Sequence, residues 1–353
     1  MDQQFLRKLL NQISVSGCEE SGQKVLKEYM GQYADEIRSD EMGNVICIAN
    51  PDSPVRIMLS AHADEIGLLV TRITESGRIQ AIERGGIIPA TYPGQKVQIL
   101  TGKGIVYGAV EGYRELYKKN DLKAADLLID IGATSKEEAA RYVALGDTIV
   151  PDTGMRELIN GRITARALDD RIGVFIIMEA LRRAQEKGCS AGVYAAATVG
   201  EETTKNGAYW ASTRIQPTLA IVVGVTYCID YSGLSNPAEA GDVLLGGGPV
   251  LCNSPIVVKG LNDRMVECAE KIGIPTQREA ASRLSYTDAD QIHFSNQGVP
   301  TVLVSVPLRN MHTAAEVADM SDVNGCIELI AEFVCTYIDN AYKDARVKRS
   351  KPT

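Results

Sequence analysis

Three histidines occur in the 353 residues of the chain, at positions 62, 293 and 312. His62 comes shortly after the apolar run VRIMLS, and Asp64 follows two residues later. In open α/β sheets, functional sites form just outside the carboxyl ends of strands. An H-x-D pair at such an end can place an imidazole and a carboxylate on the same side of an extended segment. His62 is therefore either a metal ligand oriented by Asp64 or an ordinary buried histidine.

Two pairs of adjacent carboxylates also stand beside apolar segments. Asp169 and Asp170 open an expected helix, where carboxylates commonly act as caps. Glu201 and Glu202 follow the apolar run VYAAATVG, at the end of an expected strand. Because adjacent residues of an extended chain point in opposite directions, one glutamate can bind metal while the other faces an attacking water. Metal hydrolases need this division between a ligand and a separate general base.

The second histidine with a strand-end position is His312, which follows the run TVLVSV, whereas His293 is interpreted as a structural residue on a helix. Nitrogen and oxygen ligands without cysteine suit zinc, cobalt or manganese. A carboxylate shared by two divalent ions would form a two-metal site, with the ions about 3.5–4 Å apart. The chain has no GxSxG elbow, no P-loop and no GxGxxG helix entry, which argues against serine hydrolase and nucleotide chemistry.

The elements that must position these side chains follow an α/β pattern. Apolar strands that alternate with helices predict a mostly parallel sheet flanked by helices. Between residues 68 and 160, short β-type runs separated by Gly/Pro turns predict an inserted, small β-barrel-like domain, so that residues 1–67 and 161–353 form the catalytic domain. The expected helices cover residues 4–13, 20–30, 135–145, 170–187, 207–213, 262–272 and 321–343, and the expected strands outside the insertion cover 44–49, 55–59, 192–199, 219–225, 250–258 and 301–306.

The composition is that of an ordinary globular protein, with 45% apolar and 23% charged residues and a net charge of -8. The basic tail over residues 343–351 is short, so neither nucleic acid nor an anionic membrane is an expected partner. No apolar run approaches the roughly 20 residues that span a bilayer, and the charged N-terminus does not resemble a signal peptide. The eight scattered cysteines include no CxxC pair and are interpreted as buried, reduced thiols. These features predict a cytoplasmic protein.

From about residue 3 to 340 the chain resembles the tetrahedral and glutamyl aminopeptidases, di-metal exopeptidases that assemble as dodecamers. The resemblance lies in SAHADEIG, RALDDRIG, TVGEET, SYTDAD and PLRNMHTAAEV, in this order and spacing. It implies a di-zinc exopeptidase-like fold whose inserted domain serves subunit assembly, and the label endoglucanase for some members. It also implies two metal ions and a role for each of six residues: His62 as ligand of the first metal, Asp64 as its orienting carboxylate, Asp169 as the bridging ligand, Glu201 as general base, and Glu202 and His312 as ligands of the second metal.

One position departs from the pattern of this family. The resemblance implies an aspartate ligand of the first metal in the strand that follows the glutamate pair, and the matching residue is Gly224 in AIVVGVTYCID. Glycine has no side chain with which to bind metal. The nearest carboxylate, Asp230, lies six residues further on. The first metal is therefore expected to be weakly held, or to use a water in this gap.

Three functions remain open on this basis. The first is metal-dependent removal of N-terminal residues from short peptides, with Glu201 as the base that deprotonates the attacking water. The second is a weakly active or inactive protein that serves in assembly or binding, which Gly224 favours. The third is a glycosidase that uses the Glu201–Glu202 or the Asp169–Asp170 pair. It is the least favoured, because its two carboxyl groups must face each other at about 5–10 Å, whereas adjacent residues diverge.

Overall fold

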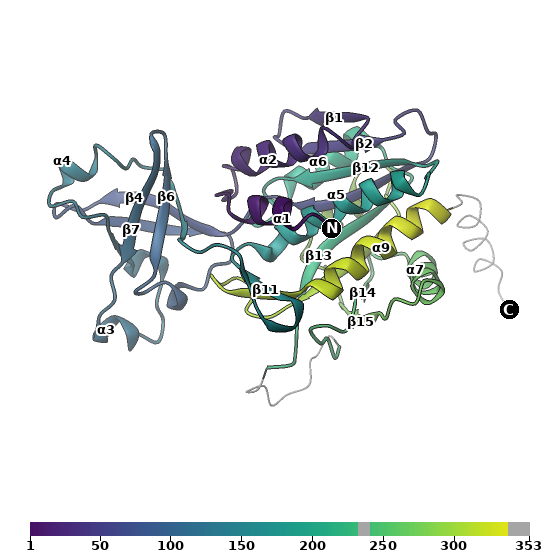
Figure 1. Ribbon diagram of the computed structural model, residues 1–353. Helices are drawn as coiled ribbons and strands as arrows, with labels where there is room; N and C mark the ends of the chain where they lie inside the picture. The colour runs from purple at the N-terminus through teal and green to yellow at the C-terminus, as the bar shows by residue number, and fades with distance from the viewer. Residues whose placement is uncertain (232–240, 338–353) are drawn as a thin grey trace.

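The computed structural model describes residues 1–231 and 241–337, which form a helix-covered sheet and a separate barrel (Figure 1). The sheet has eight strands in the order β1-β2-β12-β3-β13-β16-β14-β15. The four central strands run parallel, while β1, β2 and the β14-β15 pair are joined to their neighbours in antiparallel fashion. The predicted α/β fold is confirmed. The strands are β1 (Glu36–Ser39), β2 (Val45–Ala49), β3 (Arg56–His62), β12 (Gly192–Thr198), β13 (Leu219–Tyr227), β14 (Val250–Asn253), β15 (Gln277–Ala280) and β16 (Thr301–Leu308).

Helices cover both faces of the sheet, so its central strands are apolar over most of their length. Every residue of β2, β12 and β16 is buried. Successive side chains of β3 enter different cores: Ile57 and Leu59 pack beneath one set of helices, and Met58 beneath the other. The first core lies under α1 (Gln3–Leu10), α2 (Glu20–Met30), α5 (Leu168–Glu186), α7 (Lys259–Lys271) and α9 (Met320–Thr336), and the second under α6 (Asn206–Ile215) and α8 (Ala289–Phe294).

Six strands close into the barrel that Figure 1 shows beside the sheet, in the order β4-β5-β8-β7-β6-β9. Its interior is filled by alternate residues of the strands, such as Leu68 and Val70, or Val97 and Ile99. The barrel confirms the small β-barrel-like insertion in the predicted fold class. Its strands are β4 (Gly67–Ile73), β5 (Ile79–Arg84), β6 (Lys96–Thr101), β7 (Gly104–Val110), β8 (Leu128–Asp130) and β9 (Thr148–Pro151), with the short helices α3 (Arg114–Tyr117), α4 (Lys136–Ala139), η1 (Pro89–Thr91) and η2 (Ala124–Asp126) between them.

A small three-stranded sheet brings two distant parts of the chain to the same place. It consists of β10 (Arg156–Glu157), β11 (Arg162–Ala165) and β17 (Glu316–Asp319), with η3 (Ile159–Gly161) between the first two strands. Strand β11 runs into α5, and β17 follows the loop after β16. Because Ala165 is paired with Glu316, the start of α5 and this loop lie side by side.

Two expected elements are less than half as long as predicted. The helix expected over residues 135–145 ends after α4, where the backbone hydrogen bonds change to those of turns. A single helical turn has too few bonds to extend itself without further packing. The strand expected over residues 250–258 ends with β14, because Pro255 has no backbone N–H and the chain turns there, with Val257 donating to the carbonyl of Ser254.

The last helix was expected to reach residue 343, but its end and the basic tail lie outside the described residues, which stop at 337. Within the described part, α9 ends at Thr336. None of the helices described is long and apolar enough to cross a membrane.

Candidate metal centre

His62 is the last residue of β3 and is buried, with 7% of its surface exposed. Its Nδ1 lies 3.1 Å from the backbone carbonyl oxygen of Asp64, which can only accept, so this nitrogen carries the proton. The other ring nitrogen, Nε2, then faces Asp169 Oδ1 at 3.2 Å. Burial lowers the pKa of His62, but hydrogen bonds to Asp169 and Asp64 outweigh it and hold the pKa well above its usual value. The ring is therefore oriented toward the site by Asp64.

Asp169 lies at the junction of β11 and α5 and has the extended backbone angles φ -77° and ψ 105°. This conformation directs its carboxylate into the site instead of leaving it as a helix cap. One oxygen, Oδ1, faces His62, and the other, Oδ2, lies 3.2 Å from Nε2 of His312. Burial raises the pKa of Asp169, but the two imidazoles outweigh it and hold the pKa below its usual range. Asp169 thus stands between the two histidines.

Glu201 and Glu202 occupy the turn that follows β12, and Asp64 holds their backbone. The N–H of Glu201 donates to Asp64 Oδ1 at 3.0 Å, and that of Glu202 donates to Oδ2 at 3.2 Å. The hydroxyl of Ser16 also donates to Oδ2, at 2.5 Å. The two glutamate side chains diverge: Glu201 Oε2 lies 3.8 Å from Nε2 of His62, whereas Glu202 Oε1 lies 3.8 Å from Nε2 of the other histidine.

His312 lies in the loop between β16 and β17, with a left-handed backbone (φ 64°). Its Nδ1 donates to the backbone carbonyl oxygen of Gly86, which belongs to the barrel segment after β5, at 2.7 Å. Its Nε2 is therefore directed at Asp169, as in His62. The hydrogen bond to Asp169 raises the pKa of His312 to about 9. The barrel thus supplies an acceptor that orients a side chain of the site.

Two further carboxylates support the site, and neither was identified from the sequence. Glu316 is buried and accepts hydrogen bonds from the backbone N–H groups of Asp169, at 3.1 Å, and His312, at 2.8 Å. Burial raises its pKa to about 8. Glu65 is equally buried and is paired with both Arg166 and Arg171. In the sequence, the final glutamate of MHTAAE was the available signal for Glu316, and the final glutamate of HADE was the signal for Glu65.

Other residues singled out from the sequence lie outside this group. His293 lies on α8, with its ring edge-on to Phe294 at 5.3 Å. Asp230 cannot substitute for a ligand at Gly224, because its carboxylate is paired with Arg309, at 2.9 Å from Nε. Asp170 is fully buried and accepts from the backbone N–H of His62 at 3.4 Å.

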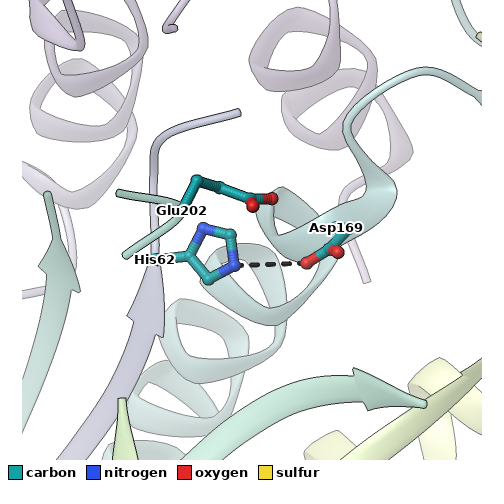
Figure 2. A group of neighbouring side chains, drawn as sticks. All are labelled: His62, Asp169 and Glu202. Atoms are coloured by element: carbon teal, nitrogen blue, oxygen red, sulfur yellow. Dashed lines mark hydrogen bonds and ion pairs between the residues drawn. The ribbon is translucent and has the colours of Figure 1, made fainter. Parts of the chain in front are cut away.

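The donor set suits a divalent cation. Ligand atoms of His62, Asp169 and Glu202 all lie within 4.8 Å of one another, and Figure 2 shows the two carboxylates converging on the imidazole. In both histidines the proton is on Nδ1, so in the neutral rings two acceptors, Nε2 and a carboxylate oxygen, face each other at 3.2 Å. A cation between them removes this repulsion: in the metal-free protein a second ring proton does so, in keeping with the raised pKa of both histidines, and a metal ion would take its place when bound.

Proteins that are similar in sequence or in structure match almost the whole chain. A lysyl aminopeptidase from Pyrococcus furiosus is 32% identical over 343 residues, which are 93% of this chain and 95% of the relative. The TET aminopeptidase of Thaumarchaeota archaeon SCGC AB-539-E09 has a TM-score of 0.91 at 32% identity, covering 97% of this chain and 98% of the other. A TET1 peptidase from Pyrococcus horikoshii has a TM-score of 0.84 at 30% identity, covering 95% and 99%.

Some other similar solved structures are named endoglucanases, as the resemblance implied. Residues 43–329 match the pattern of the M42 glutamyl aminopeptidases. This match covers more than half of the chain and includes every residue placed around Asp169 above except Ser16. The chain therefore belongs to the M42 glutamyl aminopeptidase family.

Proposed function

We propose that the protein is a metal-dependent aminopeptidase that releases N-terminal residues from short peptides. The observation that carries the proposal is the position of Asp169, with one carboxylate oxygen facing each imidazole and Glu201 and Glu202 diverging beside them. Membership of a family whose relatives are named aminopeptidases supports the same reaction.

The proposed chemistry divides the work among these side chains. A bound divalent ion, zinc, cobalt or manganese, supplies a Lewis acid that activates water and polarises the scissile carbonyl. The residues that would hold metal are His62, Asp169, Glu202 and His312. Glu201 takes the proton from the attacking water and delivers it to the leaving amine. Asp64 keeps this base in place through the backbone N–H of Glu201.

A small pocket beside the site supports a substrate that enters by its end. It is lined from the barrel side by Ile66 and Tyr92 and from the loop side by Thr313, and it reaches Asp169 and Glu202. The free α-amino group of a peptide is cationic, and the carboxylates at the end of this pocket have the opposite charge. A chain terminus, rather than the middle of a long polymer, fits this arrangement.

We also propose that the barrel serves self-association and that the protein is a cytoplasmic homo-oligomer, with a dodecamer as the expected state. The P. horikoshii relative is described as assembling into a tetrahedron or a large octahedral shell. On the barrel, Tyr107 is 63% and Leu145 76% exposed, which is unusual for such large apolar side chains unless another surface covers them. The mass of the assembly is measured directly by light scattering of the protein as it leaves a size-exclusion column.

The function is tested with aminoacyl anilides in the presence of added zinc or cobalt. Glu201→Gln should lower kcat by about 10²–10⁴-fold, because it removes the base but keeps the size of the side chain. Glu28→Gln makes the same chemical change on the exposed face of α2 and should leave the rate unaltered. Equal activity of wild type and Glu201→Gln, or activity that survives exhaustive chelation, would rule this mechanism out.

A second candidate function is an assembly or binding protein with little turnover, which the missing side chain at Gly224 favours. The same assay separates the two, because such a protein would assemble normally while its rate matches that of Glu201→Gln. Hydrolysis of a glucan by the chelated protein would instead support a glycosidase.

A further inference from the structure

The two sides of the site share two of their ligands, Asp169 and Glu202. On the His312 side, three atoms face the same space: Nε2 of His312, Asp169 Oδ2 at 3.2 Å and Glu202 Oε1 at 3.8 Å. Three protein ligands with an open fourth position are the usual set of a catalytic zinc site. Glu202 also approaches His62, so it lies within reach of both sides.

On the His62 side the third ligand is Glu202, which the His312 side also uses, and the neighbouring strand of the sheet adds no further one. Strands β3 and β13 are paired in parallel from Ile57–Leu219 to Ser60–Val222, and two residues further on come His62 and Gly224. Residues at the same level of neighbouring parallel strands point to the same face. The position nearest to His62 on β13 therefore carries no side chain.

There is room at Gly224 for a larger residue. A Cβ atom there would meet Cγ2 of Thr287 at 3.5 Å and Cδ1 of Leu303 at 3.8 Å, which are ordinary van der Waals contacts. The backbone is that of a strand and not of the left-handed region. Glycine is therefore not required by packing at this position, and its effect on the site is the removal of a possible ligand.

A cationic side chain lies on this same side. Nζ of Lys205 is 2.8 Å from Oε1 of Glu201, while Oε2 of that glutamate faces His62 at 3.8 Å. Lys205 has a left-handed backbone (φ 56°), and its N–H donates to the carbonyl of Gly200 at 2.8 Å, which closes the turn that carries both glutamates. Its side chain is 23% exposed, so the charge lies at the edge of the site and not in open solvent.

We propose that Lys205 takes the place of a second metal ion, so that the chain binds one divalent ion tightly, on the His312 side, and the lysine ammonium positions Glu201 on the other. The proposal concerns the same centre as the proposed function and rests on it for the role of Glu201. An ammonium that is paired with Glu201 repels a divalent ion beside His62. Once Glu202 binds an ion on the His312 side, His62 and Asp169 are the two ligands left, and they are too few to offset that repulsion. The site thus holds one exchangeable cation, the divalent ion, and one cation that belongs to the chain, the ammonium of Lys205.

The test is a count of bound ions, which does not depend on turnover. Metal-free protein is titrated with cobalt, followed by its visible absorption, and with zinc, followed by calorimetry and elemental analysis. The wild type should bind one equivalent tightly. The double variant Gly224→Asp/Lys205→Met, which supplies the ligand and removes the charge, should bind two. Gly224→Asn/Lys205→Met is the matched control without the carboxylate and should remain at one.

The contribution of the lysine is isolated by two single variants. Lys205→Met should tighten weak binding of a second ion by at least about tenfold, whereas Lys205→Arg, which keeps the charge, should leave it unchanged. Two tight ions in the wild type, or the same second affinity in Lys205→Met and Lys205→Arg, would overturn the proposal. If the protein binds one ion but cleaves no anilide, the proposed function fails and the metal count still stands.

The positioning role has a separate readout. Loss of Lys205 should lower kcat with little change in KM, since Glu201 remains but is less well held, and arginine should restore part of the rate. A Lys205→Met variant with unaltered kcat would show that Glu201 is held without the lysine.

Discussion

The two histidines that flank Asp169 are held by different kinds of structure. His62 ends a central strand, with paired strands on both sides, and its orienting partner Asp64 is two residues away. His312 lies in a loop with a left-handed backbone, and its orienting acceptor is the carbonyl of Gly86, 226 residues away. Local strand geometry therefore positions the first imidazole, whereas packing of the barrel against the sheet positions the second. The side proposed to hold the tightly bound ion is the one that depends on long-range packing.

The largest expected effect separates the two histidines directly. If the tightly bound ion lies on the His312 side, His312→Ala should weaken zinc binding by more than about 100-fold, since loss of a supporting residue alone costs about 10–100-fold. His62→Ala should weaken it by less than about tenfold. Calorimetric titration measures both, and His293→Ala provides a control away from the site. Equal losses in the two variants would mean that the two sides are equivalent.

A smaller effect is expected from the barrel. A Cβ atom at Gly86 would lie 3.0 Å from both Cε1 and Nδ1 of His312, so Gly86→Ala should displace the imidazole. Zinc affinity should fall by about 10–100-fold while the thermal unfolding of the protein remains similar. Gly102→Ala is the matched control, because nothing lies within 4 Å of its Cβ position. Unaltered affinity in Gly86→Ala would show that His312 does not depend on the barrel.

The smallest expected effect is on stability in the absence of metal. The pKa of His312 is about 9 in the folded chain, against about 6.5 unfolded, because of its hydrogen bond to Asp169. A raised pKa stabilises the folded state below the unfolded value, and this stabilisation is lost as the pH rises from about 6.5 to 9. Denaturant unfolding of metal-free protein should show this fall, and His312→Asn should reduce its slope.

Metal should reverse this dependence on pH. Binding requires the unprotonated imidazole, so the affinity for zinc should increase as the pH rises over the same range. Calorimetry in buffers of different ionisation enthalpy should detect protons released on binding at pH 7. Binding at pH 7 without proton release would show that His312 is already neutral there.

The features that could be predicted from the sequence are those with a local signature. Apolar runs mark β3, β12 and β16, and sites lie at the carboxyl ends of such strands, so His62, Glu201 and Glu202 could be singled out together. The order and spacing of the family's motifs also singled out Asp169, although the residues next to it favoured a helix cap. In the structure its extended backbone directs the carboxylate into the site instead.

The features that escaped prediction depend on partners far apart in the chain. A backbone carbonyl such as that of Gly86 has no sequence signature. Glu65 and its two arginines appear, one by one, as ordinary charged residues, and only the fold buries them together. Lys205 likewise looks like a solvated residue of a loop until the turn after β12 places it beside Glu201.

The placement of the barrel within the chain also has a consequence for the order of folding. The barrel strands follow one another closely in the sequence, whereas both neighbours of β3 in the sheet, β12 and β13, come only after the barrel. Contacts between nearby residues form faster than distant ones, so the barrel can close while β3 still has two unpaired edges. The site around His62 is then completed only when Asp169, 107 residues later, and the loop that carries His312, near the end of the described chain, have folded against it. Metal binding is thus among the last properties that a newly made chain acquires, and a tightly bound ion reports that folding is complete.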